Sequence, residues 1–99
     1  MLKNQLLLVL DVGNTNTVLG LYNGDKLVEH WRVATDSRST TDELGVLYKS
    51  LFSARQIDPA TLGGAICSCV VPPMVHGITR ACQRYFDLDV QFVGPATHT

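Results

Sequence analysis

The chain has 99 residues, 45% of them hydrophobic, and a formal net charge of −1, as is typical of one small globular domain. A net charge this close to zero gives no general attraction for nucleic acid or an anionic membrane surface, so we expect neither as a partner. Three cysteines, an odd number set among apolar residues, favour a reducing cytoplasmic compartment over a disulfide framework. No apolar run is long enough to cross a membrane, and the amino terminus lacks the pattern of a signal peptide.

The first structured stretch is an apolar run, Leu6 to Leu10, which ends on Asp11. Five apolar residues are too few for a helix, and the glycine and asparagines that follow favour a buried strand. A short loop, residues 13–16, leads to a second apolar run from Thr17 to Tyr22. The pattern predicts two antiparallel strands with a carboxylate at the mouth of their hairpin.

The composition of this loop is typical of an anion site. Successive backbone N–H groups in a tight loop form a concave site for phosphate, and Gly13 allows close approach and a positive φ. Further donors come from the side chains of Asn14, Thr15, Asn16 and Thr17. Asp11 would repel a bare phosphate, so its presence is explained if it holds Mg²⁺, directly or through water. A hairpin turn that binds no ligand explains the same residues about as well on this chemistry alone.

Two further elements complete the first half of the chain. Asn23, Gly24 and Asp25 predict a tight turn into a third strand, Lys26 to Ala34, whose alternation places Leu27 and Trp31 on one face. Thr40 and Glu43 have the spacing of a capping box, which predicts a helix from Thr41 to about Arg55. The apolar stripe of that helix comprises Leu44, Leu47, Tyr48, Leu51 and Phe52.

The second half predicts a strand from Gly64 to Val71, a helix that starts at Pro72 and a last strand from Val90 to Val93. The order is β-β-β-α-β-α-β in a mixed sheet, and the crossover helix makes the fourth strand parallel to the first. Cys67 and Cys69 face the same way on a strand but lack a second ligand pair at zinc-site spacing. Nor does any nucleophile stand near the three scattered histidines, His30, His76 and His98.

The run from Asp11 to Val18 resembles the first phosphate-binding motif of type III pantothenate kinases, and residues 41–45, 68–73 and 93–95 resemble the same family in the same order. These kinases belong to the superfamily of acetate kinase, sugar kinases, heat-shock protein 70 and actin. The resemblance implies an α/β fold, the ribonuclease H-like (actin-like ATPase) half-domain, with ligands beyond the carboxyl ends of the strands. It implies that the ATP phosphates contact Asp11, Val12, Gly13, Asn14, Thr15, Asn16, Thr17 and Val18.

The resemblance also implies an activity, which is phosphorylation of pantothenate by ATP in the first step of coenzyme A synthesis. Its expected setting is a cytoplasmic homodimer that uses Mg²⁺, held by Asp11, and a monovalent cation such as K⁺ or NH₄⁺. ATP and pantothenate are the expected partners. Ser68 lies in a stretch that borders the nucleotide pocket in the family, so a structural role and a role beside the ligand are equally open.

The sequence departs from the family at two places. The family's catalytic Asp lies in a Gly-x-Asp-Arg motif soon after the Val-Gly-Pro loop, and these 99 residues contain no such motif. We therefore expect the catalytic Asp to lie beyond Thr99, so that this chain itself contains no catalytic residue. In the loop after the last strand, Ala96 and His98 replace a usual Gly and Lys, and Ala does not take a positive φ as cheaply as Gly.

This departure sets the expected domain and its activity. We expect residues 1–99 to be a single amino-terminal domain, truncated before the Gly-x-Asp-Arg motif and the second domain. Phosphoryl transfer needs a group that orients or deprotonates the acceptor, and the chain does not clearly offer one. It is therefore expected to bind nucleotide phosphate weakly and not to turn over.

Two other functions compete with the kinase. The first is a non-catalytic interaction or regulatory protein derived from the kinase fold. The second is a metal-dependent nuclease of the ribonuclease H type, which needs several carboxylates around paired metals, whereas no other acid clearly ends a strand next to Asp11. A rise in melting temperature with Mg²⁺ and ATP would favour the kinase over the interaction protein.

Overall fold

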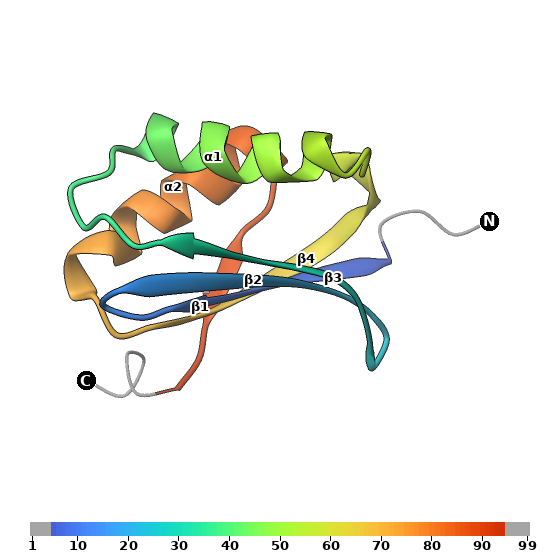
Figure 1. Cartoon of the computed structure of the whole chain (residues 1–99), viewed down its shortest axis with the longest axis horizontal. Helices are drawn as coiled ribbons and strands as arrows, with labels where there is room; N and C mark the ends of the chain where they lie inside the picture. Colours follow the sequence, from blue (N-terminus) through green and yellow to red (C-terminus); the bar gives the residue numbers. More distant parts are fainter. Residues whose placement is uncertain (1–4, 95–99) are drawn as a thin grey trace.

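The computed structural model describes residues 5–94, which form a five-stranded sheet with two α-helices on one of its faces (Figure 1). Two short 3₁₀ turns, η1 (Pro59–Thr61) and η2 (Pro72–Met74), precede a strand and a helix. The main elements are β1 (Leu6–Val12), β2 (Asn16–Asn23), β3 (Lys26–Ala34), α1 (Thr41–Ala54), β4 (Leu62–Cys69), α2 (Val75–Phe86) and β5 (Val90–Phe92). The predicted order β-β-β-α-β-α-β is confirmed.

Strand β1 lies at the centre of the sheet, whose order is β3-β2-β1-β4-β5. β1, β2 and β3 are antiparallel, whereas β4 runs parallel to β1 and β5 runs parallel to β4, so the predicted mixed sheet is confirmed. β1 is two residues longer than predicted, because Asp11 pairs with Val18 on one side and with Ser68 on the other. Asp11 therefore belongs to the strand itself, and the loop begins after Val12.

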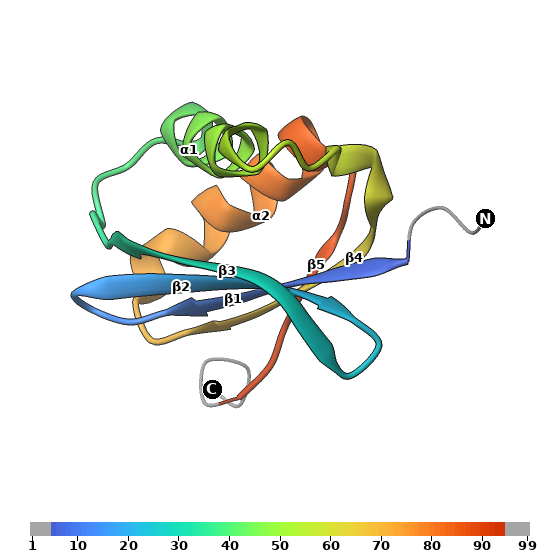
Figure 2. The same cartoon turned by 45° about the vertical axis from the view of Figure 1, so that its right-hand side comes forward.

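The two faces of the sheet have different surroundings (Figure 2). Both helices cover one face, which we call the helix face, and the side chains of Leu8, Leu10 and Val12 on it are fully buried. Alternate residues point to the other side, because successive side chains of a strand face opposite ways. We call this other side the open face; on β1, β2 and β4 it comprises Leu7, Val9, Asp11, Val18, Gly20, Tyr22, Gly64, Ile66 and Ser68.

The predicted face of Leu27 is wrong, because a β-bulge interrupts the alternation of β3. Leu21 pairs with Glu29, but the next residue, Tyr22, pairs with Leu27, so one residue of β3 has no partner on β2. The bulge moves Leu27 to the open face, where it is 45% exposed and packs near Gly20. Regular alternation in the sequence gives no sign of this extra residue.

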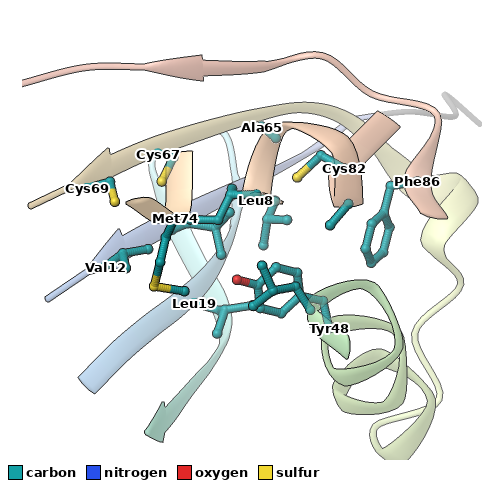
Figure 3. Packing of buried hydrophobic residues seen from close by; sticks show 14 of the residues in the cluster. Leu8, Val12, Leu19, Tyr48, Ala65, Cys67, Cys69, Met74, Cys82 and Phe86 are labelled. Carbon is teal, nitrogen blue, oxygen red and sulfur yellow. The ribbon is translucent and has the colours of Figure 1, made fainter. Parts of the chain in front are cut away.

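Helix α1 begins where the capping box predicted. The Thr40 hydroxyl accepts a hydrogen bond from the Glu43 N–H at 3.1 Å, and the Glu43 carboxylate accepts one from the Thr40 N–H at 2.8 Å. The helix buries Leu44, Tyr48 and Phe52 in the core. Figure 3 shows the Tyr48 ring pointing from α1 into this core. The ring of Phe52 stacks on Trp31 with centroids 5.5 Å apart, so that α1 packs against β3.

The later elements follow the prediction with shifted ends. β4 spans Leu62–Cys69 rather than Gly64 to Val71, because the chain leaves the sheet at Val70, which is 51% exposed. The Cys69 thiol donates to the Val71 carbonyl at 3.3 Å and accepts from the Val71 N–H at 3.4 Å, which closes the turn. The two prolines form η2, and β5 ends one residue earlier than predicted. Within residues 5–94 no helix has the length and apolarity needed to span a lipid bilayer.

Candidate phosphate-binding loop

The loop between β1 and β2 is closed by its own backbone. The Gly13 N–H donates to the Asn16 carbonyl at 2.9 Å, and a Cβ on Gly13 would lie 3.1 Å from that oxygen. Glycine is therefore favoured here by a close backbone approach. The positive φ that Gly13 was expected to allow occurs instead, among the described glycines, at Gly24 and Gly94.

The tip of the loop carries donors without internal partners. Among residues 5–94, no group accepts a hydrogen bond from the N–H of Asn14 or Thr15. Both residues and Asn16 are exposed, and their side-chain amides and hydroxyl make no hydrogen bond in the same part of the chain. Two free N–H groups with adjacent polar side chains have the chemistry to bind an anion, and phosphate binding by this loop stays a prediction.

Thr17 differs from the other predicted ligands because it faces the helices. Its side chain is only 3% exposed, and its hydroxyl lies 2.8 Å from the hydroxyl of Thr35. One of these two hydroxyls donates to the other, and the second keeps a free proton. Val12 pairs with Thr17 and is fully buried, and its carbonyl accepts a hydrogen bond from the Val70 N–H at 3.0 Å. Of the predicted phosphate ligands, Val12 therefore offers no accessible surface in this structure.

Thr35 is a residue of this site that the sequence reasoning missed. It follows β3 directly, and its N–H donates to the Thr15 carbonyl at 2.8 Å in addition to the contact between its hydroxyl and Thr17. The distance of 18 positions between Thr17 and Thr35 carries no motif. The pairing of β2 with β3, which brings Asn16 opposite Ala34, is the signal from which the contact could have been found.

Asp11 lies on the open face beside the loop. Its carboxylate is exposed, and within the described residues it makes no salt bridge or hydrogen bond. Val18 on β2 and Ser68 on β4 are its register partners, each about 5 Å away across the sheet. An unpaired carboxylate next to a hydroxyl matches the oxygen ligands that Mg²⁺ prefers, so the residues present fit this ion.

Ser68 faces Asp11 and the start of the carboxyl-terminal loop. A Cβ on Gly94 would stand 3.4 Å from the Ser68 hydroxyl oxygen, and Gly94 has a φ of +82°. The glycine therefore leaves room next to this hydroxyl.

The predictions for the carboxyl-terminal loop fall outside the part of the chain that the structure describes. Ala96 and His98, which replace family residues, lie there, and so does Thr99. The expectation that the catalytic Asp lies beyond Thr99 therefore stays a prediction.

The open face also has a shallow hollow of about 330 Å³ beside Asp11. Its lining includes Tyr22, Leu27 and His30, together with the backbone of Gly20. His76 is exposed on α2, on the other side of the sheet, so these two histidines do not converge. Within residues 5–94 no group of three or more His, Cys, Asp or Glu side chains is placed to hold a metal.

The three cysteines are buried side chains of the core (Figure 3). Burial raises the pKa of the Cys82 thiol to about 11, and it raises the pKa of Cys67 even further. Thiols that stay protonated at neutral pH are poor metal ligands and poor nucleophiles. All three cysteines are therefore packing residues of the core.

Comparison with known proteins gives a consistent family. The family model described as type III pantothenate kinase matches residues 7–99. The type III pantothenate kinase of Syntrophobacter fumaroxidans is 47% identical over 94 residues, which are 95% of this chain and 36% of that protein. The proteins of the same name from Exiguobacterium sp. and Myxococcus xanthus are 49% and 46% identical over the same length. The chain thus spans slightly more than a third of the curated relatives it matches.

Solved structures agree on the fold at much lower identity. A Bacteroides thetaiotaomicron protein of unknown function, described as having an actin-like ATPase fold, matches 96% of this chain with a TM-score of 0.56 and 8% identity. A Ppx/GppA family member from Aquifex aeolicus matches 92% with a TM-score of 0.50 and 13% identity. At these identities the likeness concerns the fold alone, and it confirms the predicted actin-like half-domain.

Proposed function

The chain belongs to the type III pantothenate kinase family, and we propose that the full-length protein phosphorylates pantothenate with ATP. In this proposal the loop between β1 and β2 holds the ATP phosphates, and pantothenate supplies the acceptor hydroxyl. The chain covers little more than a third of the relatives, so the pantothenate pocket is assigned to the remainder of the protein. Family membership also supports a cytoplasmic homodimer that requires a monovalent cation, K⁺ or NH₄⁺.

Each group of the loop has a distinct task in this proposal. The free N–H groups of Asn14 and Thr15 donate to phosphate oxygens, and Gly13 keeps the backbone close to them. Asp11 holds Mg²⁺ from the open face, directly or through water, and Ser68 stands beside it. Bound Mg²⁺ neutralises the charge of the phosphate oxygens, which phosphoryl transfer requires in addition to positioning.

For the 99-residue chain by itself we propose binding without turnover. Phosphoryl transfer to a hydroxyl needs a group that orients or deprotonates the acceptor, and the family supplies it from a Gly-x-Asp-Arg motif that this sequence lacks. We assign that motif to the part of the protein beyond Thr99. We therefore expect weak binding of MgATP and no phosphorylation of pantothenate. Phosphorylation of pantothenate by this chain would contradict that part of the proposal.

The proposal is carried by the match to the family model, which includes the loop between β1 and β2. The N–H groups at the tip of that loop are free to bind a ligand. The experiment is thermal unfolding with and without MgATP at millimolar concentration. We expect MgATP to raise the melting temperature of the wild type, because a ligand that binds the native state stabilises it. Asp11→Asn should lose most of this rise.

The matched control is Asp25→Asn, which makes the same charge change at an exposed turn of the same sheet. It should keep the full response to MgATP. A wild type whose melting temperature does not respond would contradict the phosphate-binding role and favour the interaction protein. If MgATP raised the melting temperature of Asp11→Asn as much as that of the wild type, only the proposed role of Asp11 would be contradicted.

A further inference from the structure

Two hydrogen bonds connect the phosphate loop to a residue outside its motif. The Thr35 N–H donates to the Thr15 carbonyl at 2.8 Å, and the hydroxyls of Thr35 and Thr17 lie 2.8 Å apart. We propose that Thr35 is a positioning residue, which holds the Asn14–Thr15 tip in the arrangement that binds phosphate. This inference rests on the proposed function, because it assigns the loop a phosphate ligand.

The first bond fixes the orientation of a peptide unit within the loop. The Thr15 carbonyl belongs to the peptide that joins Thr15 to Asn16, and the Asn16 carbonyl is already bound by Gly13. The tip is thereby held on both sides, by Gly13 within the loop and by Thr35 from the end of β3. Because the tip N–H groups have no internal partner of their own among residues 5–94, these two bonds keep them in place.

The second bond is partly buried. Thr17 is 3% exposed and Thr35 is half-buried, so the hydroxyl pair lies beneath the loop on the helix face. Removal of one hydroxyl leaves its partner without a hydrogen bond in a place that water reaches poorly. Such a pair favours one geometry of the loop more strongly than an exposed pair would.

The segment that carries Thr35 is itself ordered by hydrogen bonds. The Ser39 N–H donates to the Asp36 carbonyl at 3.0 Å, and the Arg38 N–H donates to the Asp36 carboxylate at 3.0 Å. Thr40 then caps α1. Thr35 is thus anchored from β3 on one side and from α1 on the other, which a residue that positions a loop requires.

The test compares three variants that differ in one hydroxyl or methyl group. Thr35→Val removes the hydroxyl and keeps the N–H and the branched shape, whereas Thr35→Ser keeps the hydroxyl. Thr79→Val is the matched control, because the Thr79 hydroxyl makes a part-buried 2.8 Å bond to Val75 within α2, away from the loop. The probe is magnesium tripolyphosphate, and its dissociation constant is measured by calorimetry on the 99-residue chain, at a temperature below the melting transition of every variant.

We expect Thr35→Val to bind the probe about threefold to tenfold more weakly, as the loss of one hydrogen bond predicts. Thr35→Ser and Thr79→Val should bind like the wild type. Amide exchange without ligand gives a second readout, in which the Gly13 and Thr35 N–H groups exchange faster in Thr35→Val and unchanged in Thr79→Val. Adding Thr17→Val to Thr35→Val should weaken binding little further, since both remove the same bond.

The outcomes separate this inference from the proposed function. A wild type that does not bind tripolyphosphate would contradict the phosphate loop itself. A wild type that binds, together with a Thr35→Val variant that melts at a lower temperature but binds equally well, would assign Thr35 to stability only and overturn the inference.

Discussion

The helix face and the open face of the sheet behave differently over the same few residues of β1. On the helix face Leu8, Leu10 and Val12 are fully buried, and the hydroxyl of Thr17 is bonded to Thr35. On the open face the carboxylate of Asp11 is exposed and without a partner among the described residues. A carboxylate on the helix face would carry a large desolvation penalty. The alternation of side chains along β1 therefore determines that Asp11 lies on the exposed face.

The phosphate loop lies where these two faces meet. The helix face contributes support to the loop, because the hydroxyls of Thr17 and Thr35 are bonded to each other there. The open face contributes the unpaired Asp11 carboxylate, and the tip of the loop contributes the N–H groups of Asn14 and Thr15, which have no partner among residues 5–94. Within β1 the alternation of side chains buries Leu10 and Val12 on the helix face and exposes the Asp11 carboxylate on the open face.

The largest effect that sharpens this comparison comes from two neighbouring leucines. Leu8→Ala, on the helix face, should lower the free energy of unfolding by about 2–5 kcal/mol, because it leaves a cavity in a closed core. Leu7→Ala, on the open face, should cost about 1 kcal/mol or less, because its side chain is already partly exposed. Urea denaturation measures both values. Equal losses would mean that the open face is as tightly packed as the helix face.

A smaller effect is the pH dependence that a buried thiol of the interior, Cys82, gives to the free energy of unfolding. Burial raises the pKa of the Cys82 thiol from 9.0 to about 11. Below pH 9 the thiol is protonated in both states, so it adds no pH dependence. Between pH 9 and pH 11 the unfolded chain loses the proton that the folded chain keeps, so the free energy of unfolding falls as the pH rises.

We expect the wild type to lose about 1–3 kcal/mol over that interval from this thiol, and Cys82→Ala to lose correspondingly less. The measurement is urea denaturation at several pH values across the same interval. The substitution also removes packing atoms, but that cost is the same at every pH and leaves the slope unaffected. An identical slope in both proteins would show that Cys82 titrates normally in the native state.

The sequence was sufficient for features with local causes. The apolar run before Asp11, the Asn-Gly turn before β3 and the capping box of Thr40 each depend on neighbouring residues, and the structure confirms all three elements. The open-face position of Leu27 was not predictable in this way, because the bulge depends on how β3 pairs with β2. The ends of β4 were shifted for a similar reason, since Val70 is apolar and yet leaves the sheet.

The same distinction applies to the loop. Its ligand-binding composition was visible in the run from Asp11 to Val18, but the division of that run between two faces was not drawn from it. Thr35 was missed because its contacts with Thr15 and Thr17 arise from strand pairing rather than from spacing. The register of β2 against β3 brings these residues together, and no motif in either segment specifies that register.

Titration of the ¹⁵N-labelled chain with MgATP, followed by the amide chemical shifts, tests the central claim most directly. We expect the largest shifts at the N–H groups of Asn14 and Thr15, smaller ones at Asp11 and Ser68, and none along the exposed side of α2. Shifts confined to other surfaces, or no shifts at millimolar MgATP, would contradict the claim that this loop binds the phosphates of ATP.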